Sequence, residues 1–119
     1  MSNRENPSSN PNEFILVITT TNSLKEAKKI AKLLVKRNCA ACVSISSPVL
    51  SVYKWRDKIE NEDEFMLIIK TIGSSYSTVE SLIRDQHSYE LPEIIAVPLS
   101  EIEDSYSRWV LQNSDHLKS

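Results

Sequence analysis

Apolar positions near the start of the chain change from the period of a strand to that of a helix. Residues 14–20 are apolar or β-branched on both alternating faces, which is typical of a strand buried on both sides. Apolar residues then recur at helical spacing from Leu24 to Val35, and Ser23 with Glu26 has the spacing of a capping box. The pattern therefore predicts a strand followed by a helix.

The central part of the chain is predicted to form a long hairpin. Residues 40–55 alternate with strand periodicity, and Pro48 indicates a bulge or an edge. Residues 65–71 form a second, mostly apolar strand, and the two strands are expected to pair antiparallel. The acidic residues between them are expected at the hairpin tip, where such runs are usually only solvated: Glu60, Glu62, Asp63 and Glu64. The alternative is that they attract a cation.

Two further capping-box spacings predict two further helices. Ser77 with Glu80 opens a helix that continues to about His87. Ser100 with Glu103 opens a last helix, with one apolar face formed by Ile102, Tyr106, Trp109 and Val110.

Between these helices, Pro92 stops the helical pattern and residues 94–99 predict a short strand. The resulting order is β-α-β-β-α-β with a C-terminal helix. We therefore predict an α+β fold of the ferredoxin-like type with an extended central hairpin.

Composition limits the number of domains and the class of partner. The chain has 119 residues, which we divide into a polar, disordered tail at residues 1–12 and a single domain at residues 13–119. Fourteen basic and sixteen acidic residues, without a long basic run, argue against nucleic acid or a membrane as the main partner. The apolar runs are too short for a membrane span or a secretory signal, so a cytoplasmic location is expected.

The predicted sheet has more apolar surface than one chain covers. Two crossover helices cover one face, yet the first, third and fourth predicted strands are apolar on both faces. The central hairpin is also longer than strands usually are, and it would extend beyond its own domain. Pairing with further copies would cover both features, and we therefore predict a homo-oligomer.

Few residues indicate chemistry. Cys39 and Cys42 lie between a helix and a strand, where a redox pair is not expected, and a second pair that would complete a zinc site is missing. Gly73 is the single glycine, which excludes a glycine-rich phosphate loop, and the serines show no local signature of a nucleophile. We therefore expect a protein that is not an enzyme.

His87 is the strongest candidate metal ligand. Tyr89, Glu90 and Glu93 follow it closely, and an imidazole with carboxylates suits copper, zinc or nickel. The alternative is that His87 only ends a helix, where the dipole favours it. One histidine and one or two carboxylates are too few for a firm structural site, so any site would be weak or shared between subunits.

Residues 41–71, ACVSISSPVLSVYKWRDKIENEDEFMLIIKT, and residues 87–98, HSYELPEIIAVP, resemble the CutA family of divalent-ion tolerance proteins. The resemblance extends from residue 14 to about residue 112. It implies a ferredoxin-like fold, a tight homotrimer whose hairpins exchange edges, and an association with tolerance to copper and other divalent cations. The family's similarity to PII signalling trimers implies an alternative role as a small-ligand or protein-interaction module without catalytic activity.

The resemblance also implies roles for individual residues. It implies His87 as the metal-binding side chain, for copper or zinc bound weakly and with no organic cofactor. It implies a cleft between subunits that contains Trp55, Glu64, Lys70, Tyr89 and Glu93. Some metal-binding members have a cysteine where this chain has Ile18 and Thr19, and its loss removes a soft ligand that would favour copper.

Overall fold

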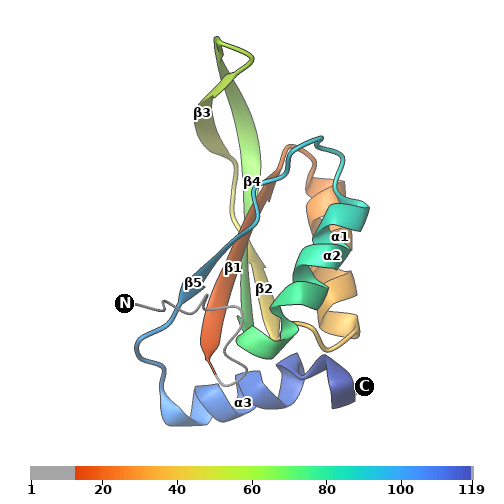
Figure 1. Ribbon diagram of the computed structural model, residues 1–119, viewed down its shortest axis with the longest axis vertical. Coiled ribbons are helices and arrows are strands. Elements are labelled where there is room, and N and C mark those ends of the chain that lie inside the picture. Colours follow the sequence, from red (N-terminus) through yellow and green to blue (C-terminus); the bar gives the residue numbers. More distant parts are fainter. Residues whose placement is uncertain (1–12, 119) are drawn as a thin grey trace, which may run out of the picture.

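The computed structural model describes residues 13–118 (Figure 1). The tail that was predicted to be disordered, residues 1–12, lies outside the described residues. The described elements are β1 (Phe14–Thr21), α1 (Leu24–Lys36), β2 (Cys42–Ile45), β3 (Val49–Trp55), β4 (Lys58–Ile72), η2 (Gly73–Ser75), α2 (Tyr76–Gln86), β5 (Ile95–Pro98), α3 (Asp104–Ser114) and η3 (His116–Lys118). The prediction of an α+β, ferredoxin-like fold with a C-terminal helix is confirmed.

The strands form a sheet in the order β2-β4-β1-β5, and β3 pairs with the first half of β4. All of these pairs are antiparallel, and the register of β1 on β4 runs from Phe14 opposite Ile72 to Thr21 opposite Phe65. Helices α1 and α2 lie together on one face of the sheet, and the β3–β4 hairpin projects beyond them (Figure 1). The outer half of the hairpin is therefore solvated on both faces.

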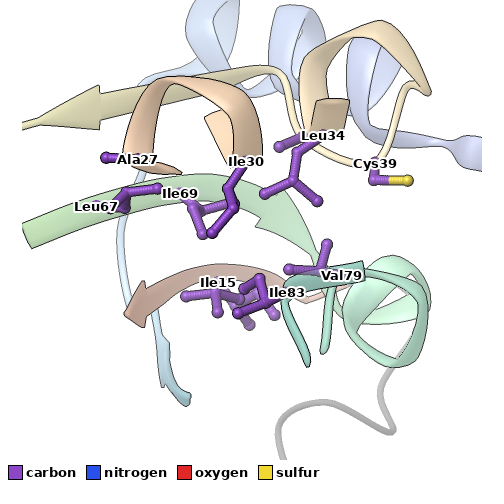
Figure 2. Packing of buried hydrophobic residues seen from close by; sticks show 11 residues of the cluster. Ile15, Ala27, Ile30, Leu34, Cys39, Leu67, Ile69, Val79 and Ile83 are labelled. Carbon is purple, nitrogen blue, oxygen red and sulfur yellow. The ribbon is translucent and has the colours of Figure 1, made fainter. Parts of the chain in front are cut away.

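The main core lies between the sheet and these two helices. Ile30 and Leu34 of α1 and Ile83 of α2 are at most 1% exposed. Figure 2 shows them with Ile15 and Ile69, which alternate with outward-facing positions along β1 and β4. Burial of a large aliphatic side chain stabilises the fold by about 1.5–3 kcal/mol. This layer therefore holds the sheet and both helices as one unit.

The first predicted helix is confirmed together with its N-terminal cap. The Ser23 hydroxyl accepts a hydrogen bond from the Glu26 N–H at 3.1 Å, as the capping-box spacing predicted. Asn38 has φ 57°, the left-handed conformation that asparagine tolerates better than most residues.

The predicted hairpin needs two corrections. The first strand, predicted as residues 40–55, is divided into β2 and β3 by a break at residues 46–48, which include Pro48. The second strand begins at Lys58 rather than at residue 65, so the acidic residues expected at the tip lie along β4. The tip is instead the turn at Arg56 and Asp57, which have φ 51° and 67°. Positive φ at both central residues is the geometry of a tight type I′ hairpin turn.

Two of the predicted helix caps were also wrong. Helix α2 begins at Tyr76 after a 3₁₀ turn, so Ser77 lies inside the helix and does not cap it. Helix α3 is capped by Glu103, whose carboxylate accepts the Tyr106 N–H at 2.8 Å, and Ser100 lies outside it. At α3 a carboxylate satisfies a free N–H of the first turn as well as a hydroxyl can, whereas α2 follows a 3₁₀ turn and its N-cap Ser75 makes no side-chain capping hydrogen bond. The serine spacing alone therefore did not locate these ends.

The face of the sheet opposite α1 and α2 is only partly covered in one chain. Helix α3 packs on one end of it, where Val110 contacts a small cluster with Ala41 and Ile72. The predicted apolar face of α3 is only partly buried, because Tyr106 and Trp109 are 41% and 43% exposed. Other exposed large apolar side chains lie on the hairpin and on the edge strand β5: Leu50, Val52, Ile59, Ile95 and Val97.

Candidate functional site

His87 lies just after α2, and its side chain is fully buried. Its Nε2 lies 2.7 Å from the Thr20 carbonyl oxygen, so Nε2 carries the proton and donates to it. Its Nδ1 accepts the Tyr89 N–H at 3.1 Å. The imidazole therefore joins the end of β1 to the segment that leaves α2.

This environment conflicts with the prediction that His87 is a metal ligand. A neutral imidazole has one lone pair for a metal ion, and here that lone pair, on Nδ1, is directed at the Tyr89 N–H. Metal binding at His87 would break one of its two hydrogen bonds inside the protein. The arrangement fits a positioning role, and the nearest carboxylate, Glu26, lies 3.5 Å from Nδ1.

A groove of about 610 Å³ lies between the β3–β4 hairpin and the segment that follows His87. Its lining comes from β1, β3, β4 and that segment: Thr20, Ser51, Val52, Tyr53, Lys54, Trp55, Glu62, Glu64, Tyr89, Glu90, Leu91 and Glu93. Four residues of the predicted cleft, Trp55, Glu64, Tyr89 and Glu93, thus lie on a single groove. The predicted cleft did not include Glu62, which the sequence placed only in an acidic run at the hairpin tip, although its period-two spacing from Glu64 would have placed both on one face of a strand.

Glu64 is the most buried acidic residue of the groove, with 6% exposure. It lies where β4 stops pairing with β3 and begins to pair with β1. Its Oε2 accepts the Tyr89 hydroxyl at 2.6 Å, and it makes no ion pair with any residue of the described chain. Burying a carboxylate without a counter-charge is unfavourable, so Glu64 favours a positively charged partner.

Glu62 likewise accepts hydrogen bonds from neutral donors. Its two carboxylate oxygens accept the Tyr53 hydroxyl at 3.1 Å and the Asn22 side-chain amide at 2.8 Å. Both donors are neutral, so they fix the orientation of the carboxylate without cancelling its charge. Glu62 and Glu64 therefore present two oriented, uncompensated charges on the same face of β4.

The pKa values of the neighbouring groups reflect this negative potential. The pKa of the Tyr89 hydroxyl is strongly raised, first by burial and then by its hydrogen bond to Glu64 and the charge there. The pKa of Tyr53 is raised by partial desolvation and by Glu62. The pKa of Glu93 is raised by partial desolvation and then by the charge of Glu64. A cation in the groove would relieve the repulsion that contributes to each shift.

At the outer end of the groove, the chain supplies a cation of its own. The guanidinium of Arg56 lies 5.5 Å from the centre of the Trp55 ring, a cation–π distance. It also lies 3.5 Å from the Glu90 carboxylate, and both charged side chains are 74% exposed. The outer end is therefore partly neutralised, whereas Glu62 and Glu64 at the inner end are not.

Lys70 does not join the groove of its own chain. Its Nζ donates to the Ser44 hydroxyl at 2.5 Å and lies 3.7 Å from the Cys42 sulfur. It is six residues from Glu64 along β4, which corresponds to about 20 Å in a strand. Within one chain, the predicted cleft therefore lacks its predicted lysine.

The two cysteines are free. Cys39 is buried, and burial raises the pKa of its thiol, which makes it a poor metal ligand or nucleophile. Among residues 13–118, no group of three or more His, Cys, Asp and Glu side chains is arranged to hold a metal ion. An ion in the groove would therefore need ligands from water or from another chain.

Comparisons with known proteins agree on one family. The family model described as CutA1 divalent ion tolerance protein matches residues 15–113. Protein CutA of Mus musculus is 32% identical over 109 residues, which cover 92% of this chain and 62% of that protein. The divalent-cation tolerance protein CutA of Thermus thermophilus is 32% identical over 99 residues, covering 83% of this chain and 96% of that protein. The chain thus spans less than two thirds of the mouse protein but nearly all of the bacterial one.

Solved structures give the same result. The CutA structure from Xylella fastidiosa superposes with a TM-score of 0.84 and 33% identity, covering 87% of this chain and 99% of that one. The Cut A1 structure from Thermus thermophilus gives a TM-score of 0.83 and 32% identity, with 85% and 98% covered. No helix in residues 13–118 is both long and apolar enough to cross a membrane.

Proposed function

Because the chain belongs to the CutA1 divalent ion tolerance family, we propose that it is a homotrimeric protein that binds divalent cations at the groove around Glu64. Its role in divalent ion tolerance would then rest on reversible binding of the ion, and we assign no catalytic step to the groove.

The observation that carries this proposal is the uncompensated charge of Glu64. It is nine-tenths buried, faces the groove, and receives only the neutral Tyr89 hydroxyl as a partner within the described chain. Glu62 and Glu93 add further carboxylates to the same lining. Oxygen ligands of this kind suit Mn²⁺, Mg²⁺ or Ca²⁺ better than copper, which favours imidazole and thiolate ligands. We therefore shift the proposed ligand from His87 to Glu64.

The exposed apolar surface supports the assembly part of the proposal. Leu50 and Val52 of β3 are 65% and 64% exposed, and Ile95 of β5 is 48% exposed. Among residues 13–118, both strands also have an edge that pairs with no other strand. Apolar side chains beside open edges favour pairing with further copies. The resemblance to the family implies three copies, and we propose a trimer on that basis. A neighbouring chain would then supply ligands that a single groove lacks.

Calorimetric titration with Mn²⁺ at pH 7 tests the proposal. We expect Glu64→Gln, which keeps an acceptor for Tyr89 but removes the charge, to weaken Mn²⁺ binding at least tenfold. Glu101→Gln removes an exposed carboxylate outside the groove and should leave the affinity unchanged. Wild-type affinity in Glu64→Gln, or loss of binding only in His87→Gln, would show that the ion binds elsewhere.

The shape of the groove favours a second candidate function, which is binding of a small organic ligand as in PII-like signalling modules. Its volume of about 610 Å³ is in the range of small-molecule sites. Its walls include the rings of Tyr53, Trp55 and Tyr89, which a bare metal ion would not use.

A further inference from the structure

The carboxylates of the groove are spread along it. Glu62 and Glu64 are two residues apart on one face of β4, a step of about 7 Å, and Glu90 and Glu93 lie on the opposite wall. No three acidic, histidine or cysteine side chains in residues 13–118 converge closely enough to hold a metal ion. Spaced negative charges match a ligand with spaced positive charges better than they match one compact ion.

The groove surface between the carboxylates is aromatic and apolar. Tyr53, Tyr89 and Leu91 line it together with Glu62 and Glu64. The Tyr89 ring packs against the His87 ring, whose centre lies 4.6 Å away at a tilt of 58°. Such walls bind methylene chains through apolar contact and bind ammonium groups through cation–π attraction. Neither contact is available to a hydrated metal ion.

The outer end of the groove already contains one cationic group bound in this way. Arg56 places its guanidinium against the Trp55 ring and beside the Glu90 carboxylate. The inner end repeats the combination of an aromatic residue with a carboxylate, in Tyr89 with Glu64 and in Tyr53 with Glu62, but without a cation from the described chain. The residues that line the groove include four carboxylates and Lys54, and Arg56 lies beside its outer end, so the net charge of the groove is negative.

From this arrangement we infer that the groove binds a linear aliphatic polyamine, with ammonium groups at Glu64 and Glu62 and the methylene chain along Tyr53 and Tyr89. The inference goes beyond the proposed divalent-cation function, with which it shares only the negatively charged groove around Glu64. Glu64 is the anchoring residue because it is the most buried of the four carboxylates.

Spermidine and butane-1,4-diamine are the probes, and butane-1,4-diol is the neutral control with the same carbon chain. Calorimetric titrations use the full-length protein at moderate salt. We expect wild-type protein to bind spermidine more tightly than the diamine and to show no heat of binding with the diol. Glu64→Gln should weaken spermidine binding at least tenfold, and Tyr53→Leu several-fold, while Glu101→Gln should bind as the wild type does. Circular dichroism and light scattering confirm that each variant keeps its fold and assembly.

Equal spermidine affinity in Glu64→Gln and Glu101→Gln would overturn the inference, because binding would then reflect only the overall negative charge of the protein. Separate Mn²⁺ titrations distinguish the two proposals. Mn²⁺ binding without spermidine binding would overturn the inference and leave the proposed function intact. Spermidine binding that depends on Glu64, in a protein that does not bind Mn²⁺, would support the inference and overturn the divalent-cation proposal.

Discussion

His87 and Glu64 both have buried ionisable side chains, but the two differ in the partners that the protein provides for them. His87 has a partner within the protein for each ring nitrogen, so its side chain links β1 to the groove wall. Within residues 13–118, Glu64 has a single neutral partner, which orients its carboxylate and leaves the charge to be compensated. At the scale of single residues, we therefore assign a structural role to His87 and propose Glu64 as the binding group.

Substitution of His87 by alanine tests the structural assignment. The change leaves the buried Thr20 carbonyl and the Tyr89 N–H without partners and creates a cavity. We expect the free energy of unfolding to fall by about 2–4 kcal/mol, measured by urea denaturation at fixed protein concentration. His87→Gln keeps a donor and an acceptor and should lose less. A loss below about 0.5 kcal/mol in His87→Ala would mean that these hydrogen bonds contribute little.

The raised pKa of Glu93 predicts a pH dependence of cation binding. Partial desolvation and the charge of Glu64 make this carboxyl group take up a proton at a higher pH than an ordinary glutamate does. A bound cation favours the ionised form, so protons compete with it as the pH falls from 7 through that raised pKa. We expect Mn²⁺ affinity, measured by calorimetry across this range, to decline there, and the decline to move to lower pH in Glu93→Gln. An identical pH profile in Glu93→Gln would remove Glu93 from the site.

At the scale of elements, the sequence predicted the helices and the sheet strands much better than the outer hairpin. Periodicity located β1, α1 and the inner part of β4, because each has one face buried in the core. The outer part of β4 has no core to face, so the sequence pattern places its acidic residues at the hairpin tip rather than in the strand. Whether a serine or a glutamate caps a helix depends on local side-chain geometry, which a spacing rule does not contain.

The turn at the hairpin tip gives a prediction for this element. Asp57 has φ 67°, a conformation that β-branched residues strongly disfavour. We expect Asp57→Val to lower the free energy of unfolding by about 1–2 kcal/mol and Asp57→Gly to leave it unchanged or slightly raised. Thermal denaturation of both variants beside the wild type provides the measurement. Equal stability of the valine and glycine variants would contradict a left-handed conformation at Asp57.

At the scale of the whole molecule, the described part of one chain covers one face of the sheet and leaves much of the other face exposed. Helices α1 and α2 bury the first face, whereas Leu50, Val52 and Ile95 remain exposed beside open strand edges. The candidate site, too, is only partly accounted for by the sequence. Trp55, Glu64, Tyr89 and Glu93, which the resemblance implies for a cleft between subunits, line one groove of a single chain. No sequence pattern shows which partners satisfy the ring nitrogens of His87 or how far along β4 Lys70 lies from the groove.

Light scattering coupled to size exclusion tests the assembly. We expect a mass three times the chain mass of 13.5 kDa. Val52→Glu places a charge in the exposed apolar surface of β3 and should shift the mass towards one chain, while Lys28→Glu, on the exposed side of α1, should not. A wild-type mass of one chain would contradict the predicted homo-oligomer.

A crystal structure of the assembled protein soaked in Mn²⁺ tests the central claim most directly, because the anomalous signal locates the ion without reference to any model of its ligands. The account predicts a manganese peak within bonding distance of the Glu64 carboxylate, with His87 still hydrogen-bonded to Thr20 and Tyr89. Manganese on the His87 imidazole, or a Glu64 carboxylate paired with a lysine or arginine of a neighbouring chain and no ion in the groove, would contradict it.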